Sequence, residues 1–327
     1  MSGSPRTPAR AATSQQVADR AGVSRPTVSQ VLNGRAALFA AETVDKVLRA
    51  ADELDYRPSV AGRALARGRS DIVVLALPYV TYGPLLQDIV DGLSASLAER
   101  GYAALVHFAG SDHAATERLV DRLLPAAVAD LGALTAAERD RLRERGAVVV
   151  GPGGAATNEL AGELQAGHLA DRGHTRLDFA LIDDPRHDQY GPERLRGFAR
   201  ACARRGLAEP RTWHVPLDRD RARGVLEGAL GADRPSAMGC YNDDVAATLA
   251  AAARDLGVRV PEDLALIGMD DTVSGRVAEP AITTLAADSR HAGEVFSAQL
   301  VAALDGADLL DDPEPAASFR LVRRGST

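Results

Sequence analysis

Residues 13–34, TSQQVADRAGVSRPTVSQVLNG, decide the fold of the amino-terminal part of the chain. Thr13 followed three residues later by Gln16 predicts a capping box at the start of a short helix. Gly22 is expected to end that helix, and Ser24 is a suitable N-cap for a second helix that runs to the end of the segment. Two short helices joined by a turn that contains glycine predict a helix-turn-helix.

The segment that follows is as informative. A third helical pattern, from Glu42 to Leu54, leads into DYRPSVAGRALARGRS, residues 55–70. Ser59 can cap a further segment of about two turns, in which Gly62 costs roughly 1 kcal/mol relative to alanine. Because so short a helix is marginal alone, we expect it to be a hinge that folds only against DNA and a partner chain.

Composition and charge separate the chain into two parts. A length of 327 residues favours two or three compact units. The net charge is −7, but residues 1–70 carry 11 Lys and Arg against 6 Asp and Glu, so this part is +5 and the remainder is −12. A basic head on an acidic body predicts that only the head meets phosphate.

Nothing in the sequence points to a membrane. No apolar run approaches the ~20 residues that span a bilayer, and the first residues lack the apolar core of a signal peptide. The two cysteines form no spacing pattern and favour a reducing compartment. We therefore expect a cytoplasmic protein without a membrane partner.

From residue 71 onward, apolar strand-like runs alternate with helical patterns. The runs are DIVVLALP, YAALVHF, AVVV, LDFALI and ALIG, and glycines follow predicted helix ends at 101, 146, 173, 206 and 257. Repeated strand–helix units predict parallel sheets covered by helices on both faces.

The helix-turn-helix followed by DYRPS and an arginine-flanked Leu65 resembles the LacI/GalR (lac/gal repressor) family of transcriptional regulators. The resemblance continues more weakly in GPERLRGF, residues 191–198, and GVRVPEDLALIGMDDT, residues 257–272. It implies a small all-α helix-turn-helix head and an α/β core of two Rossmann-like parallel-sheet subdomains, similar to the periplasmic binding proteins.

This resemblance also implies the domain organisation. The expected parts are a flexible arm (1–12), a helix-turn-helix domain (13–58), a hinge helix (59–70), a core (71–322) and a tail (323–327). Within the core, the first subdomain would comprise about 71–175 and 289–310, and the second about 176–288 and 311–322.

Two side chains of the second helix are candidates for reading bases. Arg25 suits guanine and Gln30 suits adenine, whereas Pro26 could offer only an apolar contact to a thymine methyl group. Leu65 resembles the leucine that family members wedge into the minor groove. Further candidates for DNA contacts, mainly to phosphate, are Thr13, Ser24, Thr27, Ser29, Asn33, Ser59 and Arg63. Ordinary helix surface is the less favoured alternative for Thr27 and Ser29.

For the core, the resemblance implies an effector site. Arg194, Asn242 with Asp243, and Asp270 match effector-contacting positions of the family, and a guanidinium beside carboxylate and amide groups suits a sugar-like ligand. Two further candidates are Tyr82 and Asp183.

Acidic pairs at 183–184, 243–244 and 270–271 follow predicted strands, where ligands bind in open α/β sheets, although each could also be a solvated loop. About ten family residues, including a strand, are missing after Gly154. A regulator without a ligand therefore remains an alternative.

An enzyme is the less favoured reading. Gly151, Gly153 and Ala156 match part of a dinucleotide fingerprint, but no acidic residue ends a following strand at the required distance. Metal-ligand spacing and a catalytic triad are also absent from the local sequence, so neither a cofactor nor a metal is expected. Since one helix-turn-helix covers half a site, the sequence predicts a homodimer on a near-palindromic operator. The family resemblance implies that this dimer is a repressor modulated by a small polar effector.

Overall fold

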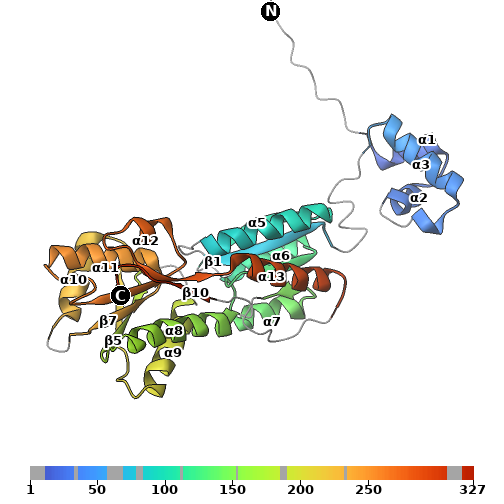
Figure 1. Ribbon diagram of the computed structural model, residues 1–327. Helices are drawn as coiled ribbons and strands as arrows, with labels where there is room; N and C mark the ends of the chain where they lie inside the picture. Colours follow the sequence, from blue (N-terminus) through green and yellow to red (C-terminus); the bar gives the residue numbers. More distant parts are fainter. Residues whose placement is uncertain are drawn as a thin grey trace, which may run out of the picture. The chain divides into compact units, whose positions relative to one another are not determined.

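The computed structural model describes residues 12–32, 36–56, 69–78, 84–110, 113–151, 154–184, 190–231, 234–307 and 319–327. Two compact units are distinguished, Met1–Ile72 with Val120–Ala126, and Val73–Leu119 with Ala127–Thr327 (Figure 1). The first unit contains the head, and the second contains the α/β core. None of the helices described is long and apolar enough to cross a membrane.

The head is a small helical domain with its own apolar centre. It consists of α1 (Ser14–Ala21), α2 (Arg25–Gln30), the short 3-10 helix η2 (Ala36–Leu38) and α3 (Ala41–Glu53). Val17, Val28 and Val47 come from the three α-helices and are completely buried together. This three-helix packing confirms the predicted all-α head.

Local capping sets the limits of the head helices. Thr13 and Gln16 form the expected capping box, and Gly22 ends α1 with a left-handed φ of 65°. The Ser24 hydroxyl accepts a hydrogen bond from the Thr27 N–H at 3.2 Å, as an N-cap should. The α-helical part of α2 ends at Gln30 and helical backbone continues through Leu32, while the predicted helix end at residues 33–34 lies outside the described residues.

The core alternates strands and helices throughout. Its first part contains β1 (Ile72–Pro78), α5 (Pro84–Glu99), β2 (Ala103–Ala109), α6 (His113–Leu123), β3 (Ala127–Asp130), α7 (Ala136–Glu144) and β4 (Val149–Val150). Its second part contains α8 (Gly154–Asp171), β5 (Leu177–Ile182), α9 (Tyr190–Arg204), β6 (Thr212–Val215), α10 (Arg219–Ala229), β7 (Ala237–Cys240), α11 (Asp243–Asp255), β8 (Ala265–Met269), α12 (Val273–Val277), β9 (Thr283–Ala287), α13 (Ser289–Leu304) and β10 (Phe319–Val322).

The strands form two separate sheets, which confirms the predicted fold class. The first has the order β2-β1-β3-β4, and the second has the order β10-β9-β8-β7-β5-β6. β3 pairs in parallel with β1 and β4 in the first sheet, for example Val74 with Val128. In the second sheet the pairs from β6 to β9 are parallel, for example Phe179 with Gly239, and β10 pairs antiparallel with β9. We call the two sheets with their helices the first and second lobes.

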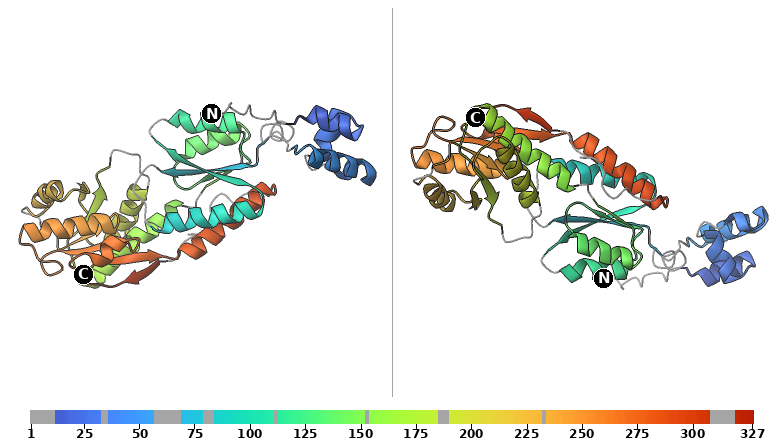
Figure 2. Two further views of the ribbon diagram at one scale, coloured as in Figure 1. Left: turned by 90° about the horizontal axis from the view of Figure 1, so that it is seen from above. Right: turned by 90° about the horizontal axis from the view of Figure 1, so that it is seen from below.

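Two late elements return to lobes formed earlier in the chain. Helix α13 lies along α5 of the first lobe (Figure 2). Ser297 Oγ of α13 donates to Ser96 Oγ of α5 at 3.0 Å. Strand β10 pairs with β9 in the second sheet. Each lobe is therefore built from segments that are separated in the chain by segments of the other lobe.

The sequence predicts that the first subdomain extends to about residue 175, which would include helix α8. In the structure α8 packs in the second lobe instead. Gln165 of α8 donates to the carbonyl oxygens of Cys240 at 2.9 Å and Gly268 at 3.0 Å, where β7 and β8 end. Its carboxamide therefore ties the helix to the second sheet. The alternation of strands and helices could not show this, since a helix between two sheets can cover either one.

Helices α8 and α9 cross at an unusually short separation that two glycines permit. A β-carbon at Gly162 would lie 2.8 Å from the backbone nitrogen of Phe198, and one at Gly197 would lie 2.6 Å from the carbonyl carbon of Glu159. These neighbours are backbone atoms of the facing helix, so they cannot rotate away. The crossing lies next to Arg194, whose backbone also faces Gly162.

We expect Gly197→Ala to lower the free energy of unfolding by about 1–3 kcal/mol or more, because the added methyl group would force the two helix backbones apart. Urea unfolding followed by the fluorescence of Trp213, the one tryptophan of the sequence, measures this. Gly224→Ala in α10 is the matched control, since a β-carbon there has no neighbour within 4 Å. That control should stabilise the helix by about 0.5–1 kcal/mol, and equal effects of the two substitutions would contradict the crossing.

Candidate functional site in the head and the core

The exposed face of α2 carries the predicted base-reading residues. Arg25, Pro26 and Gln30 are all exposed, while Val28 between them is buried in the centre of the head. The helix therefore presents one polar face outward. Arg25 Nε donates to the Ser14 hydroxyl oxygen at 3.0 Å, which restrains the guanidinium beside the start of α1.

The remaining head candidates have structural partners of their own. The hydroxyls of Thr13 and Ser24 cap α1 and α2, and Thr27 Oγ1 lies 2.8 Å from Ser24 Oγ. Thr27 and Ser29 are only partly exposed. Four further candidates lie outside the described residues, namely Asn33, Ser59, Arg63 and Leu65.

The start of α3 lacks a side-chain cap. Its N-cap is Ala40, which makes no side-chain hydrogen bond to the first turn. At the other end of α3, Glu53 forms an ion pair with Arg20 of α1 at 2.7 Å. Both side chains are well exposed, so this pair adds at most about 1 kcal/mol.

In the core, the three acidic pairs follow β5, β7 and β8, which are neighbouring strands of the second sheet. They lie along one edge of the sheet because parallel strands end on the same side. Their environments differ, however. Asp183 is an exposed residue whose Oδ2 pairs with Arg221 at 3.2 Å, and Asp271 is held by Arg276 and Arg324.

Asp243 points into the protein and is separate from any exposed ligand group. Its side chain is completely buried, and its Oδ2 accepts from the Thr272 N–H at 2.8 Å. The space that it fills exists because residues 268 and 275 are glycines, where a β-carbon would approach Asp243 to within 3 Å. Among the described residues Oδ1 has no hydrogen-bond partner, and burial raises the pKa of this carboxyl group to about 7.

Asp270 has the properties of an available carboxylate. It is partly exposed, and none of the hydrogen bonds among the described residues uses its carboxylate oxygens. Its φ of 92° is unfavourable for a residue with a side chain, and such strain often accompanies a functional site. Burial raises the pKa of Asp270, and the nearby charge of Arg194 partly opposes this shift.

Arg194 is buried on the first turns of α9 and is fixed from two sides. Its Nε donates to Asn158 Oδ1 at 3.0 Å, its Nη1 donates to the Tyr241 carbonyl oxygen at 2.5 Å, and its Cζ lies 4.9 Å above the Tyr241 ring. Asn158 also donates from Nδ2 to Glu193 Oε2 at 3.1 Å. The neighbouring charge of Asp270 completes a polar group at the ends of β7 and β8.

Asn242 is part of this edge mainly as a helix cap. It is buried, and its Oδ1 accepts from the Val245 N–H at 3.0 Å at the start of α11. The residues brought together are thus Arg194 and Asp270, while Asn242 follows Tyr241, whose carbonyl oxygen binds Arg194. Asp183 and Asp243 are directed elsewhere, and Tyr82 lies outside the described residues.

Asn158 and Tyr241 were not found from the sequence. Asn158 is 36 positions from Arg194, and Tyr241 is 47 positions from it, so no local pattern connects them. Among the described residues no group of three His, Cys, Asp or Glu side chains is arranged to hold a metal ion.

A helix-turn-helix head and a core of two parallel-sheet lobes together define a regulatory protein with a periplasmic-binding-protein-like core. Residues 13–59 match the bacterial regulatory proteins of the lacI family, and residues 166–327 match the periplasmic binding protein-like domain. The two matches together cover more than half of the chain. The chain belongs to the lacI family of bacterial regulatory proteins.

Similar proteins extend over most of the chain. The HTH-type transcriptional repressor PurR of Vibrio vulnificus (strain CMCP6) is 27% identical over 301 residues, covering 86% of this chain and 89% of that protein. PurR of Klebsiella pneumoniae (strain 342) is 29% identical over 302 residues, covering 86% and 87%.

Solved structures share the fold. The complex of the transcriptional regulator CelR with cellobiose has a TM-score of 0.64 at 25% identity and covers 97% of this chain and all of that one. The lac repressor dimer bound to operator and the anti-inducer ONPF has a TM-score of 0.70 at 23% identity, covering 97% and 99%.

We expect Asp243→Asn to flatten the pH dependence of stability. The folded-state pKa of about 7 exceeds the ordinary value of 3.8, so the folded protein binds this proton more tightly than the unfolded chain. The resulting stability is present below pH 4 and is lost as the pH rises towards 7.

Between pH 5 and pH 8 the wild type should therefore lose up to roughly 2–3 kcal/mol more than the variant, at about 1.4 kcal/mol per pKa unit. Urea unfolding at both pH values, followed by Trp213 fluorescence, gives the two differences. The same pH dependence in both proteins would contradict the titration of Asp243.

Proposed function

We propose that this chain is a transcriptional repressor that binds a near-palindromic DNA operator as a homodimer and responds to a small polar effector held by its core. The observation that carries the proposal is the exposed face of α2, where Arg25 and Gln30 stand on a helix whose opposite side is fixed in the head. Family membership and the net charge of +5 on residues 1–70 support it.

Dimer formation is supported by apolar side chains that remain exposed in the core. On the edge strand β2, Val106 and Phe108 are each 43% exposed, and on α12, Val273 and Val277 are 70% and 76% exposed. Groups of large exposed apolar side chains are typical of surfaces that bind another protein. We propose that the bound protein is a second copy of this chain, because a dimer also provides the second helix-turn-helix that binds the other half of the operator.

The relatives are transcriptional repressors, and we propose no catalytic activity for this chain. As a DNA-binding regulator it would act in the bacterial cytoplasm, on the nucleoid when bound to its operator. In the hinge, Ser59 and Arg63 remain proposed phosphate contacts and Leu65 the proposed minor-groove wedge.

An effector would bind at Arg194 and Asp270. A guanidinium can donate to a ligand hydroxyl or carboxylate, and an ionised carboxylate can accept from a hydroxyl or amine. The cellobiose complex of CelR supports a sugar-like ligand for this fold. The second candidate function is a regulator without a ligand, which is favoured by the partners that Arg194 already has in Asn158 and Tyr241.

We expect Arg25→Ala and Gln30→Ala each to weaken binding to the selected operator by about 1–3 kcal/mol, while binding to random DNA changes little for Gln30→Ala. The operator is obtained by binding-site selection on the purified protein, and affinities are measured by gel shift at two salt concentrations. A selected site with two-fold symmetry is expected.

Arg49→Ala is the matched control, because Arg49 is an exposed head arginine that belongs to α3 and not to α2. It should lower affinity for all sequences by a similar small amount and reduce the salt dependence. Equal losses for Arg25→Ala and Arg49→Ala on the operator, or no selected sequence at all, would refute base reading by α2.

We expect Asp270→Asn to abolish thermal stabilisation by the effector while leaving operator binding without ligand intact. Asparagine keeps the size and tolerates the positive φ, so the change removes mainly the charge. Sugars, nucleosides and small acids are screened by thermal shift, where a ligand at 100 times its Kd adds about 2.7 kcal/mol. If nothing stabilises the wild type and Asp270→Asn leaves regulation in cells unchanged, the regulator without a ligand is the correct alternative.

A further inference from the structure

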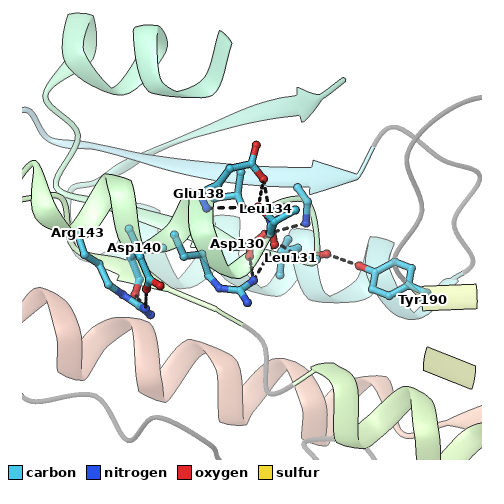
Figure 3. A network of polar contacts seen from close by, with 12 residues as sticks. Asp130, Leu131, Leu134, Glu138, Asp140, Arg143 and Tyr190 are labelled. Carbon is cyan, nitrogen blue, oxygen red and sulfur yellow. Dashed lines mark hydrogen bonds and ion pairs between the residues drawn. The ribbon is translucent and has the colours of Figure 1, made fainter. Parts of the chain in front are cut away.

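One direct side-chain contact joins the carboxyl ends of the two sheets. Tyr190 begins α9 of the second lobe, and its hydroxyl donates a hydrogen bond to the carbonyl oxygen of Leu131, just after β3 of the first lobe (Figure 3). Ligands of open α/β sheets bind beyond the carboxyl ends of the strands, so the contact lies in the region where an effector would bridge the lobes.

The first lobe is shaped to receive this ring. Gly132 has a φ of 90°, which favours glycine, and a β-carbon there would lie 2.6 Å from Cε1 and Cζ of Tyr190. Glycine is thus required by the backbone conformation and by the aromatic ring at the same time. Tyr190 belongs to the second lobe and lies 58 positions after Gly132 in the chain.

The turn that contains Leu131 is held by hydrogen bonds to the side chain of Asp130. Asp130 is completely buried, and its Oδ1 accepts from the backbone N–H groups of Gly132, Ala133 and Leu134 at 3.1, 2.7 and 3.1 Å. Its Oδ2 accepts from Arg139 Nη1 at 2.8 Å, and the same nitrogen donates to the Leu134 carbonyl oxygen at 2.8 Å (Figure 3). These bonds fix the direction of the Leu131 carbonyl group.

The second lobe holds the tyrosine with similar rigidity. Tyr190 precedes Arg194 by four residues in α9, so the two side chains leave the same face of the helix. Arg194 is fixed by Asn158 of α8, and α8 is fixed to the sheet by Gln165. Because Tyr190 stands on this fixed helix, its hydrogen bond to Leu131 can hold the two lobes together.

We infer that Tyr190 is a built-in bridge, which holds the two lobes together without ligand by occupying the first-lobe position that a bridging effector would use. The Leu131 carbonyl oxygen is bonded to the tyrosine, and the Asp130 carboxylate is bonded to its own turn. An effector that reaches Leu131 must displace the ring. The bridge itself does not depend on the proposed function, and only this consequence for the effector rests on it.

The distance between the lobes tests the bridge directly. Spin labels are attached to the full chain at Asp140→Cys on α7 and Arg254→Cys on α11, two exposed positions in different lobes, and electron–electron resonance measures their separation. The natural cysteines Cys202 and Cys240 do not interfere, because both are buried, and burial raises the pKa of Cys202 to about 11.

Without ligand, the wild type should give one narrow distance distribution. Tyr190→Phe loses the hydroxyl bond, so the ratio of separated to closed lobes should rise roughly fivefold, and Tyr190→Ala should raise it further. Gly132→Ala should separate the lobes as Tyr190→Ala does, although it changes the opposite lobe. In the double variant, Gly132→Ala should add no further separation.

Gly146→Ala is the matched control for Gly132→Ala. It lies in the same lobe with a φ of 85°, and a β-carbon there has no neighbour within 4 Å, so it carries the backbone strain without touching the tyrosine. Its distance distribution should equal that of the wild type. Circular dichroism establishes that each variant is folded.

The bridge is refuted if Tyr190→Ala and Gly132→Ala retain the wild-type distances, or if Gly146→Ala separates the lobes as much as Gly132→Ala. These readouts are independent of DNA and of any effector. Loss of operator selection would therefore refute the proposed function alone, and unchanged distances would refute the bridge alone.

Discussion

The close crossing of α8 and α9 is the constraint on which the second lobe depends. Because Gly162 and Gly197 let the two backbones touch, Asn158 of α8 reaches Arg194 of α9 across the crossing. The other end of the same unit is tied to the sheet by Gln165, which bonds to the ends of β7 and β8. The crossing thereby places the buried guanidinium next to the strand ends where Asp270 emerges.

Burial divides the acidic residues of that edge into two kinds. Asp243 and Asp270 follow neighbouring strands, yet Asp243 is enclosed by Thr272 and two glycines while Asp270 keeps its carboxylate available. Taking a carboxylate out of water raises its pKa unless donors compensate, and Asp243 has one donated N–H on Oδ2 and no partner for Oδ1 among the described residues. A buried carboxyl group that packs inside the lobe and a candidate ligand group thus arise from the same sequence pattern.

The two lobes differ in how much polar chemistry they offer. In the second lobe, Arg194 and Asp270 lie together at the strand ends. In the first lobe, both carboxylate oxygens of Asp130 already accept hydrogen bonds, from the turn after β3 and from Arg139. Among the described residues β4 is the last strand of this lobe before α8, so no further strand end is available there. An aromatic ring from the second lobe meets the first lobe at this turn. The proposed effector would therefore be held mainly by the second lobe.

The head and the strand–helix order follow from short-range physics, and they could be predicted. The helix caps and helix ends depend on residues within four positions of one another. Examples are the N-caps Thr13 and Ser24, the end of α1 at Gly22, and Gly146 after a core helix with its φ of 85°. Arg194 and Asp270 were placed through short family phrases, and the structure brings them to one edge.

What the sequence by itself determined is therefore local: which segments are helices and strands, and which end is basic. Only the tertiary structure decided that α8 belongs to the second lobe, that Asp243 turns inward, and that Tyr190 meets Leu131 and Gly132. Each of these depends on backbone and side-chain contacts between segments tens of residues apart. Their energy comes from close packing and from satisfying buried polar groups, and neither leaves a periodic signal in the chain.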